Sequence, residues 1–257
     1  WQTAQDHGIV GSIVVGTDVE TSKLAVEIAN QDTKLFAAIG IHPGHWQQDF
    51  TQDVNESINE IAAMLAKSPN VVAFGETGLD YFRLPPTDTE KIKQVQKKAL
   101  ELQLKLIQKH IKSSPNTKKL PIILHVRDTE LPEAITPGNA YWDIVEITQE
   151  FPDLQFILHC VSGPQAYVST MVDRGAYVSF AANSTYPSAQ AIRDLLPLVP
   201  KDKVLIETDA PFLPPQEFRG KVCEPWMITK TMEYLATTYG VSPEQLLINT
   251  ARCFEVL

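Results

Sequence analysis

Seven short apolar runs recur along this chain of 257 residues, and segments with helical periodicity separate most of them. Apolar runs without polar alternation are typical of strands that are covered on both faces. Strands that alternate with helices along a chain build a parallel sheet with helices packed against it. The seven predicted strands are Ser12–Gly16, Phe36–Ile41, Val71–Glu76, Ile122–His125, Phe156–His159, Ala176–Phe180 and Val204–Asp209.

The predicted helices carry apolar residues three and four positions apart. In the clearest of them, Asp88–Lys112, the residues Ile92, Val95, Ala99 and Leu102 form such a stripe. The other predicted helices are Asp53–Lys67, Tyr141–Gln149, Gln165–Asp173, Ser188–Leu196, Pro225–Tyr239 and Pro243–Leu257.

The number of strands limits the architecture, because a closed barrel of alternating strands and helices needs eight. Trp1–His7 has the pattern of a helix end, and Gly8 suits its C-cap, so we expect that the chain starts inside a helix whose preceding strand is absent. We therefore expect an α/β fold, a (β/α)8 TIM barrel lacking its first strand, built as one domain of residues 1–257. The alternative is a sheet of seven strands that is open by nature.

Composition narrows the classes of function. The net charge of −9 and the pI of about 5.2 argue against a broad basic face that grips nucleic acid through many phosphates. They remain compatible with a nuclease that holds one or two phosphates locally, and with a small-molecule substrate. No apolar run reaches the length of a membrane span, no secretory signal opens the chain, and Cys160, Cys223 and Cys253 form no Cys-x-x-Cys pair. We expect a cytoplasmic protein with reduced thiols.

Four of the predicted strands end in side chains that bind metal ions, namely Glu76, His125, His159 and Asp209. The carboxyl ends of parallel strands meet on one face of a barrel, so these four should meet as well. Imidazole and carboxylate are common ligands of zinc and similar ions. Alone, each could be a helix cap or a core histidine; four in order predict a metal site. We assign catalytic roles to Asp209, as a base for water, and to Glu207, two residues before it, as an orienting group.

Three further residues are candidates for contact with a substrate. His42 follows a predicted strand, and the adjacent Pro43 stiffens its loop. Arg127 and Arg219 could meet phosphate oxygens as planar forks. A plain loop histidine and surface salt bridges are equally good interpretations of these three residues. The sequence has no nucleophile elbow, Walker loop or dinucleotide fingerprint.

Six motifs in this order resemble the TatD family of metal-dependent deoxyribonucleases, and the resemblance covers essentially the whole chain. They are Gly40-Ile41-His42-Pro43, Gly75-Glu76-Thr77-Gly78-Leu79-Asp80-Tyr81, Ile123-Leu124-His125-Val126-Arg127-Asp128, His159-Cys160-Val161-Ser162-Gly163, Glu207-Thr208-Asp209-Ala210-Pro211-Phe212-Leu213 and Arg219-Gly220-Lys221. The resemblance implies a barrel of the amidohydrolase superfamily that binds divalent metal ions, two in number and of the type Mg, Mn or Zn.

By the same resemblance, Glu76 would bridge the ions, His125, His159 and Asp209 would be ligands, and Glu207, His42 and Arg219 would lie near the substrate. The substrate would be DNA, single-stranded or frayed at its ends and cleaved from the 3′ side. No obligate protein partner and no membrane are implied.

The chain departs from the family pattern at three places. The Asp-x-His-x-His motif of the first strand has no match here. Val222 and Cys223 replace a basic residue and an asparagine, and Val161 replaces an aromatic residue. Two alternatives therefore stay open: an enzyme of the amidohydrolase superfamily that acts on a small ester, lactone or amide, and, if the chain truly starts at Trp1, a metal-poor pseudoenzyme or interaction protein.

Overall fold

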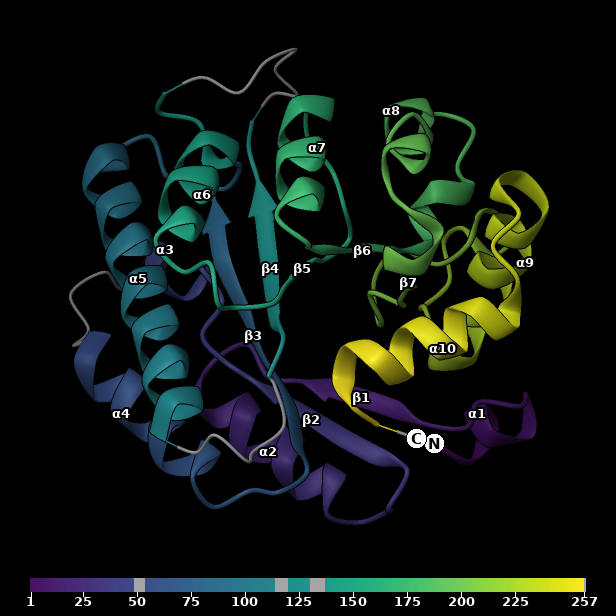
Figure 1. Ribbon diagram of the computed structural model, residues 1–257, viewed down its shortest axis with the longest axis horizontal. Coiled ribbons are helices and arrows are strands. Elements are labelled where there is room, and N and C mark those ends of the chain that lie inside the picture. The colour runs from purple at the N-terminus through teal and green to yellow at the C-terminus, as the bar shows by residue number, and fades with distance from the viewer. Residues whose placement is uncertain (49–53, 114–119, 130–136, 257) are drawn as a thin grey trace.

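The computed structural model describes residues 1–48, 54–113, 120–129 and 137–256, with the side chains of residues 47 and 48 left aside. Seven parallel strands form one curled sheet in the order of the chain, with most of the helices against its outer face (Figure 1). All seven predicted strands and the α/β class are confirmed. The strands are β1 (Ser12–Val15), β2 (Leu35–Ile39), β3 (Val71–Asp80), β4 (Ile122–Arg127), β5 (Phe156–Leu158), β6 (Tyr177–Phe180) and β7 (Val204–Ile206).

The described helices follow the prediction at most positions. They are α1 (Gln2–Asp6), α2 (Val19–Ala29), α3 (His45–Gln48), α4 (Val54–Leu65), α5 (Thr89–Ser113), α6 (Ala140–Gln149), α7 (Gln165–Asp173), α8 (Gln190–Arg193), α9 (Ile228–Tyr239) and α10 (Pro243–Phe254). Short 3₁₀ turns lie at Ala182–Thr185, Leu196–Leu198, Lys201–Lys203, Gln216–Phe218 and Pro225–Met227. The predicted ends at Asp53 and Leu257 lie outside the described residues. No described helix is both long and apolar enough to cross a membrane.

Some helical segments differ from the prediction, and the single-turn helix α3 (His45–Gln48) was not predicted. We did not predict α2, because its buried face consists of the small residues Ser22, Ala25 and Ala29 and shows no large apolar stripe. The sequence feature that marks this helix is its N-cap residue: the Asp18 carboxylate accepts a hydrogen bond from the Thr21 backbone N–H at 2.7 Å. The predicted helix Ser188–Leu196 is wrong in extent, since only Gln190–Arg193 is α-helical and a 3₁₀ turn with a proline near its start follows.

The inner face of the sheet changes character along its strands. At the amino-terminal side, Ile123, Ile157 and Leu205 form an apolar cluster with Phe254 and Val256 from the end of α10. Two residues further along the chain stand His125, His159 and Glu207. Alternate residues of a strand face the same side, so the apolar cluster is the floor on which the polar side chains stand.

Two buried glutamines attach α5 to the carboxyl side of the sheet. Gln96 accepts a hydrogen bond from the Asp80 N–H at 2.9 Å and donates one to the Asp80 carbonyl at 3.2 Å. Gln103 does the same with Ile41, at 2.9 and 3.2 Å, and also donates to the Thr77 hydroxyl. Both glutamines are 1% exposed. Each side-chain amide pairs with the backbone N–H and carbonyl of one residue, as a neighbouring strand would do.

Candidate metal centre

Glu76 lies inside β3, and the prediction that its strand ends there is wrong. The strand runs on to Asp80 and pairs residue by residue with β4 from Thr77 onward, after an irregularity between Phe74 and Thr77. The apolar pattern stops at Glu76 only because the inner face becomes polar at this point. The register puts Gly78 opposite His125.

Two glycines allow β3 and β4 to approach each other at the site. Gly75 and Gly78 have φ values of 144° and 143°, which other residues rarely adopt. A Cβ atom on Gly75 would lie 2.7 Å from the Ile123 carbonyl oxygen, and one on Gly78 would collide with the His125 carbonyl. Side chains at either position would therefore push apart the strands that carry Glu76 and His125.

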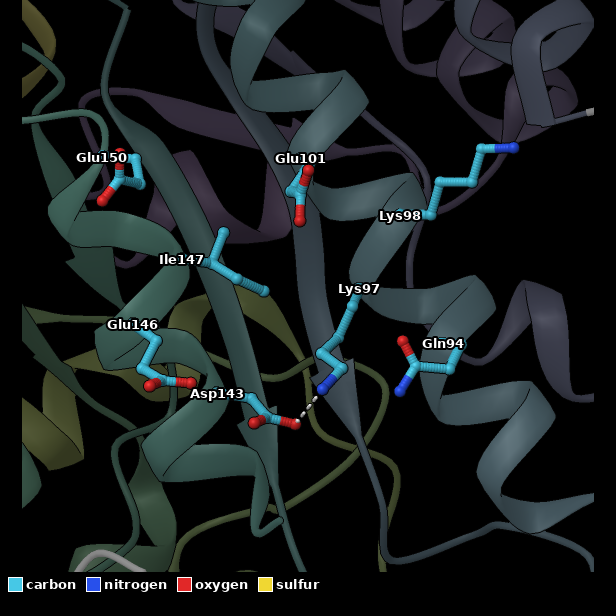
Figure 2. A pocket seen from close by; sticks show the side chains of 8 residues that line it. All are labelled: Gln94, Lys97, Lys98, Glu101, Asp143, Glu146, Ile147 and Glu150. Carbon is cyan, nitrogen blue, oxygen red and sulfur yellow. Dashed lines mark ion pairs between the residues drawn. The ribbon is translucent and has the colours of Figure 1, made fainter. Parts of the chain in front are cut away.

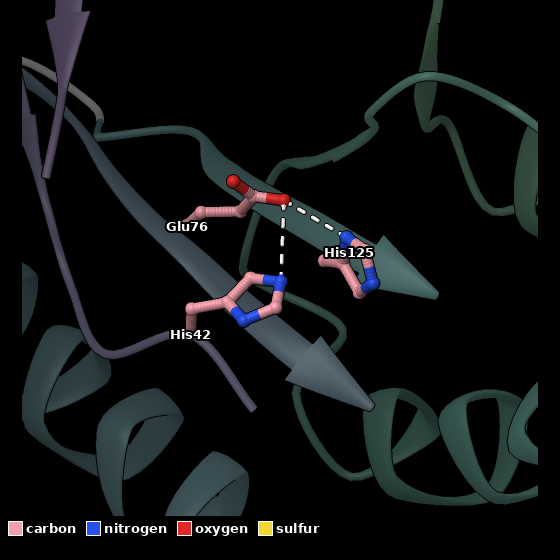
Figure 3. Close-up of side chains that lie close together, drawn as sticks. All are labelled: His42, Glu76 and His125. Atoms are coloured by element: carbon pink, nitrogen blue, oxygen red, sulfur yellow. Dashed lines mark hydrogen bonds and ion pairs between the residues drawn. The ribbon is translucent and has the colours of Figure 1, made fainter. Parts of the chain in front are cut away.

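Three imidazoles surround one oxygen atom of Glu76. Its Oε1 lies 3.0 Å from Nδ1 of His125, 3.3 Å from Nε2 of His159 and 3.8 Å from Nε2 of His42. Figure 3 shows His42 and His125 turned toward this carboxylate from neighbouring parts of the sheet. By distance, His42, Glu76 and His125 form a group that could hold a metal ion. His125 lies inside β4 and His159 directly after β5, so the predicted strand end is wrong for His125.

Each of the two predicted ligand histidines has a second carboxylate behind it. Glu207 Oε1 lies 2.7 Å from Nδ1 of His159, and Asp80 Oδ2 lies 3.5 Å from Nε2 of His125. Carboxylates in this position fix the orientation of a metal-binding imidazole and raise its basicity. The prediction missed Asp80, although the alternation Glu76-x-Gly78-x-Asp80 would have placed it on the inner face, had we expected the strand to continue.

The charges in this cluster shift the pKa values of the predicted ligands strongly. Burial favours a neutral Glu76, but the charges of His159 and His125 and a hydrogen bond with His125 outweigh it and hold the pKa of Glu76 well below its usual range. Burial likewise disfavours the charged form of His159, yet Glu207 and Glu76 raise its pKa to about 10. Without a metal ion, His159 therefore carries the positive charge that balances these carboxylates.

His42 differs from the other two histidines in protonation. Burial and the neighbouring His125 lower its pKa to about 4, so it is neutral near pH 7. The Gly44 N–H donates a hydrogen bond to its Nδ1 at 2.9 Å. A neutral imidazole that accepts at Nδ1 carries its proton on Nε2. The nitrogen that faces Glu76 is thus a donor, which suits contact with a phosphate oxygen better than ligation of a metal.

Asp209 lies three residues beyond β7, in a loop, so the predicted strand end is wrong here too. Its Oδ1 is 3.7 Å from Nε2 of His159, and its side chain is 30% exposed. Burial raises the pKa of Asp209 to about 6; His159 opposes this shift, and Glu207 and Glu76 add to it. A partly exposed carboxylate with a pKa in this range can accept a proton near neutral pH and pass it to water.

The side chains present fit a divalent ion. His125 Nε2 and Glu207 Oε1 are buried, and although Asp80 and His159 lie 3.5 and 2.7 Å from them, neither pair has the alignment of a hydrogen bond. Buried polar atoms without a partner are costly, and a bound ion with its water would relieve that cost. Imidazole nitrogens together with carboxylate oxygens are the ligand types that zinc and other first-row metals accept.

The two predicted substrate arginines lie on aromatic rings. Arg127 places its guanidinium carbon 3.9 Å from the ring centre of Phe82, and Arg219 places its own 4.2 Å from that of Tyr186. Arg127 follows His125 by two residues in β4, and Arg219 is an exposed residue of the loop region after β7. Within the described residues, neither arginine takes part in a salt bridge; the salt bridges of lysine and arginine there involve other residues.

A groove between α5 and α6 lies outside this cluster. It is lined by residues of both charges, and Lys97 pairs with Asp143 at 3.1 Å across it (Figure 2). Asp143 also accepts a hydrogen bond from the Tyr81 hydroxyl at 2.7 Å. The groove thus joins two helices through a satisfied ion pair and contains no predicted site residue.

Comparison with known proteins identifies the family. The sequence matches the family described as "TatD related DNase" over residues 1–257. An uncharacterized metal-dependent hydrolase of Buchnera aphidicola is 30% identical, over 94% of this chain and 81% of its own length. A 3′-5′ ssDNA/RNA exonuclease TatD of Salmonella typhimurium is 30% identical, over 97% of this chain and 89% of its own length.

A solved structure extends the agreement to the fold. The crystal structure of YJJV, a TatD homologue from Escherichia coli, superimposes with a TM-score of 0.79 at 26% identity, covering 100% of this chain and 90% of its own. With the whole sequence matched, the curled parallel sheet shared and a histidine–carboxylate cluster at its carboxyl side, the chain belongs to the TatD family of metal-dependent hydrolases.

Proposed function

We propose that this protein is a metal-dependent phosphodiesterase that removes nucleotides from the 3′ end of single-stranded DNA. The observation that carries the proposal is the surrounding of Glu76 Oε1 by the nitrogens of His125, His159 and His42. Relatives at 30% identity that bear the name 3′-5′ ssDNA/RNA exonuclease support the choice of substrate class.

In this proposal, Glu76, His125, His159 and Asp209 hold divalent metal ions. A bound ion polarises the phosphoryl oxygens and lowers the pKa of a water molecule. Asp80 and Glu207 keep His125 and His159 oriented from behind. Asp209 accepts the proton of the attacking water on a carboxylate oxygen, which its exposed fraction of 30% allows it to release to solvent.

The phosphate of the substrate is held by groups that donate hydrogen bonds. The His42 Nε2–H faces the cluster, since Gly44 occupies Nδ1. Arg219 is exposed and rests with one face on Tyr186, so its fork of N–H groups remains available to phosphate oxygens. These two residues together would orient the phosphodiester for attack.

The test is hydrolysis of a 5′-labelled single-stranded oligonucleotide with Mg²⁺ or Mn²⁺. Wild-type protein should shorten it stepwise from the 3′ end, and Glu76→Ala and Asp209→Asn should lose this activity. Asp202→Asn, a carboxylate whose partner is the surface residue Arg252, is the matched control. An RNA oligonucleotide and a small carboxylic ester serve as further substrates.

Two outcomes would contradict the proposal. Equal residual hydrolysis by wild type, Glu76→Ala and Asp209→Asn would reject the assigned site. Efficient hydrolysis of the small ester with no cleavage of either oligonucleotide would reject the substrate class.

A further inference from the structure

Within the described chain, the two exposed phenylalanines both closely follow carboxylate residues of the candidate metal centre. Among the large apolar residues of the described chain that are exposed, six are aliphatic, and the remaining two are Phe82 and Phe212, with 45% and 67% of their surface in solvent. Phe82 follows Asp80 by two residues, and Phe212 follows Asp209 by three. An exposed aromatic ring close to a site offers a flat surface on which a flat ligand can stack.

The backbone of each phenylalanine is hydrogen-bonded to a carboxylate residue of the site. The Phe82 N–H donates to Asp80 Oδ1 at 3.0 Å, and the Phe212 N–H donates to the Asp209 carbonyl at 2.6 Å. Asp80 pairs with His125, and Asp209 pairs with His159. The two rings therefore start from opposite halves of the cluster, one after β3 and one after β7.

One face of the Phe82 ring already has a cationic partner. The Arg127 guanidinium lies 3.9 Å from its centre, in the arrangement of a cation–π contact. The exposed part of the ring is then its other face and its edge. A flat ligand on that face would lie close to a guanidinium that can meet a phosphate.

Nucleic acid bases are flat ligands that stack on aromatic rings whatever their sequence. The net charge of −9 gives the protein no broad electrostatic attraction for nucleic acid, so such stacking would carry a larger share of the binding. Stacking also requires unpaired bases, which a duplex does not offer along its length.

We propose that Phe82 and Phe212 form a stacking platform for the bases on either side of the scissile phosphate, with Arg127 holding the Phe82 ring in place. This inference rests on the proposed function and adds a reason why single strands would be preferred. It assigns a binding role to two phenylalanines outside the metal cluster.

The test compares two single-stranded oligonucleotides, one with normal bases throughout and one with abasic sites in its last three positions. Phe82→Leu and Phe212→Leu remove the ring but keep an apolar side chain. They should each raise KM on the normal oligonucleotide about tenfold, with little change in kcat. Phe82→Tyr should retain wild-type KM. Leu247→Ala, an exposed residue of α10, is the surface control.

On the abasic oligonucleotide, wild-type KM should already be raised, and neither leucine variant should raise it further. Unchanged KM on normal bases in both leucine variants, or an equal loss on both oligonucleotides, would overturn the platform. Fluorescence anisotropy of both oligonucleotides with Ca²⁺ separates this result from the parent proposal: ring-dependent binding without any cleavage would reject only the nuclease activity, whereas no binding to wild type would reject both.

Discussion

The two halves of the metal centre are built in different ways. Glu76, Asp80 and His125 stand within β3 and β4, where the ladder between the strands and two glycines fix their backbone. His159, Glu207 and Asp209 stand just beyond β5 and β7, on backbone that has left the sheet. Only the extremes of exposure follow this division, from 1% for the Asp80 side chain to 30% for that of Asp209, since the other four side chains are 12% to 19% exposed.

This difference indicates that the two halves contribute differently to metal binding and proton transfer. Side chains within a strand have little freedom, which suits ligands that must be held in place before an ion arrives. Side chains beyond a strand end can adjust and reach water, which suits proton transfer. We therefore expect changes in the strand half to act mainly on metal binding and changes in the loop half to act on turnover as well.

The largest effect should come from the loop half. Asp209→Asn keeps the shape of the side chain but removes the acceptor for the proton of water, and should lower kcat by about 10²- to 10⁴-fold at saturating metal. Thermal unfolding should change little, because the side chain is partly exposed. A kcat within threefold of wild type would remove Asp209 from the role of base.

Damage to the strand half should appear as a loss of structure. Gly78→Ala places a Cβ atom against the His125 carbonyl, at a φ of 143°, and should destabilise the fold by about 1–3 kcal/mol and abolish metal binding. Gly175→Ala is the control, since Gly175 also has a positive φ but nothing lies within 4 Å of an added Cβ. Equal melting temperatures for the two variants would show that close approach of β3 and β4 is dispensable.

Asp80→Asn should separate metal affinity from turnover. Loss of the carboxylate behind His125 should weaken metal binding about 10- to 100-fold, and kcat should return to the wild-type value at high metal concentration. Calorimetric titration with Mn²⁺ measures the first quantity, and steady-state kinetics the second. A kcat that stays low at every metal concentration would place Asp80 in the chemistry itself.

His42→Ala tests whether His42 binds the substrate or the metal ion. Because its Nε2 carries a proton, we expect KM for an oligonucleotide to rise about tenfold, as for loss of a hydrogen bond to a charged group, while metal affinity stays the same. A loss of metal affinity as large as that of Asp80→Asn would make His42 a ligand instead.

Metal binding should also release a proton. His159, whose pKa Glu207 and Glu76 raise to about 10 against the effect of burial, is protonated in the metal-free protein at neutral pH and must lose its proton to bind an ion. Metal affinity should therefore rise with pH up to about 10, with proton release visible as a dependence of binding heat on the buffer. His42, with its pKa of about 4, should contribute none of these protons. Binding heats that do not depend on the buffer would contradict this assignment.

The sequence predicted the elements of the fold better than their ends. The apolar runs marked all seven strands, because strands covered on both faces are apolar almost throughout. The same criterion ended β3 at Glu76, since the pattern has no way to show that the strand continues under a polar lining. The helix α2 was missed for a related reason: its small buried residues form no conspicuous stripe.

The sequence predicted that the four candidate ligands would meet, as they do in the structure, but not how they are arranged, and their roles as ligands stay predictions. Residue types at the ends of apolar runs were enough to select Glu76, His125, His159 and Asp209. The proton position on His42 depends on the Gly44 N–H, and the role of Asp80 depends on the register between β3 and β4. Both are contacts between backbone and side chain that a pattern of residue types does not contain.

The glutamines of α5 have a consequence for how this site can be observed. The backbone N–H of Ile41, next to His42, donates its hydrogen bond to the Gln103 side chain and not to a strand. The backbone N–H of Asp80 donates to the Gln96 side chain in the same way. They can exchange with deuterium only when α5 lifts from the sheet. Their exchange rates therefore measure how often α5 separates from the sheet, and this measurement needs neither metal nor substrate. Gln103→Leu should speed up exchange at Ile41 more than exchange at Asp80.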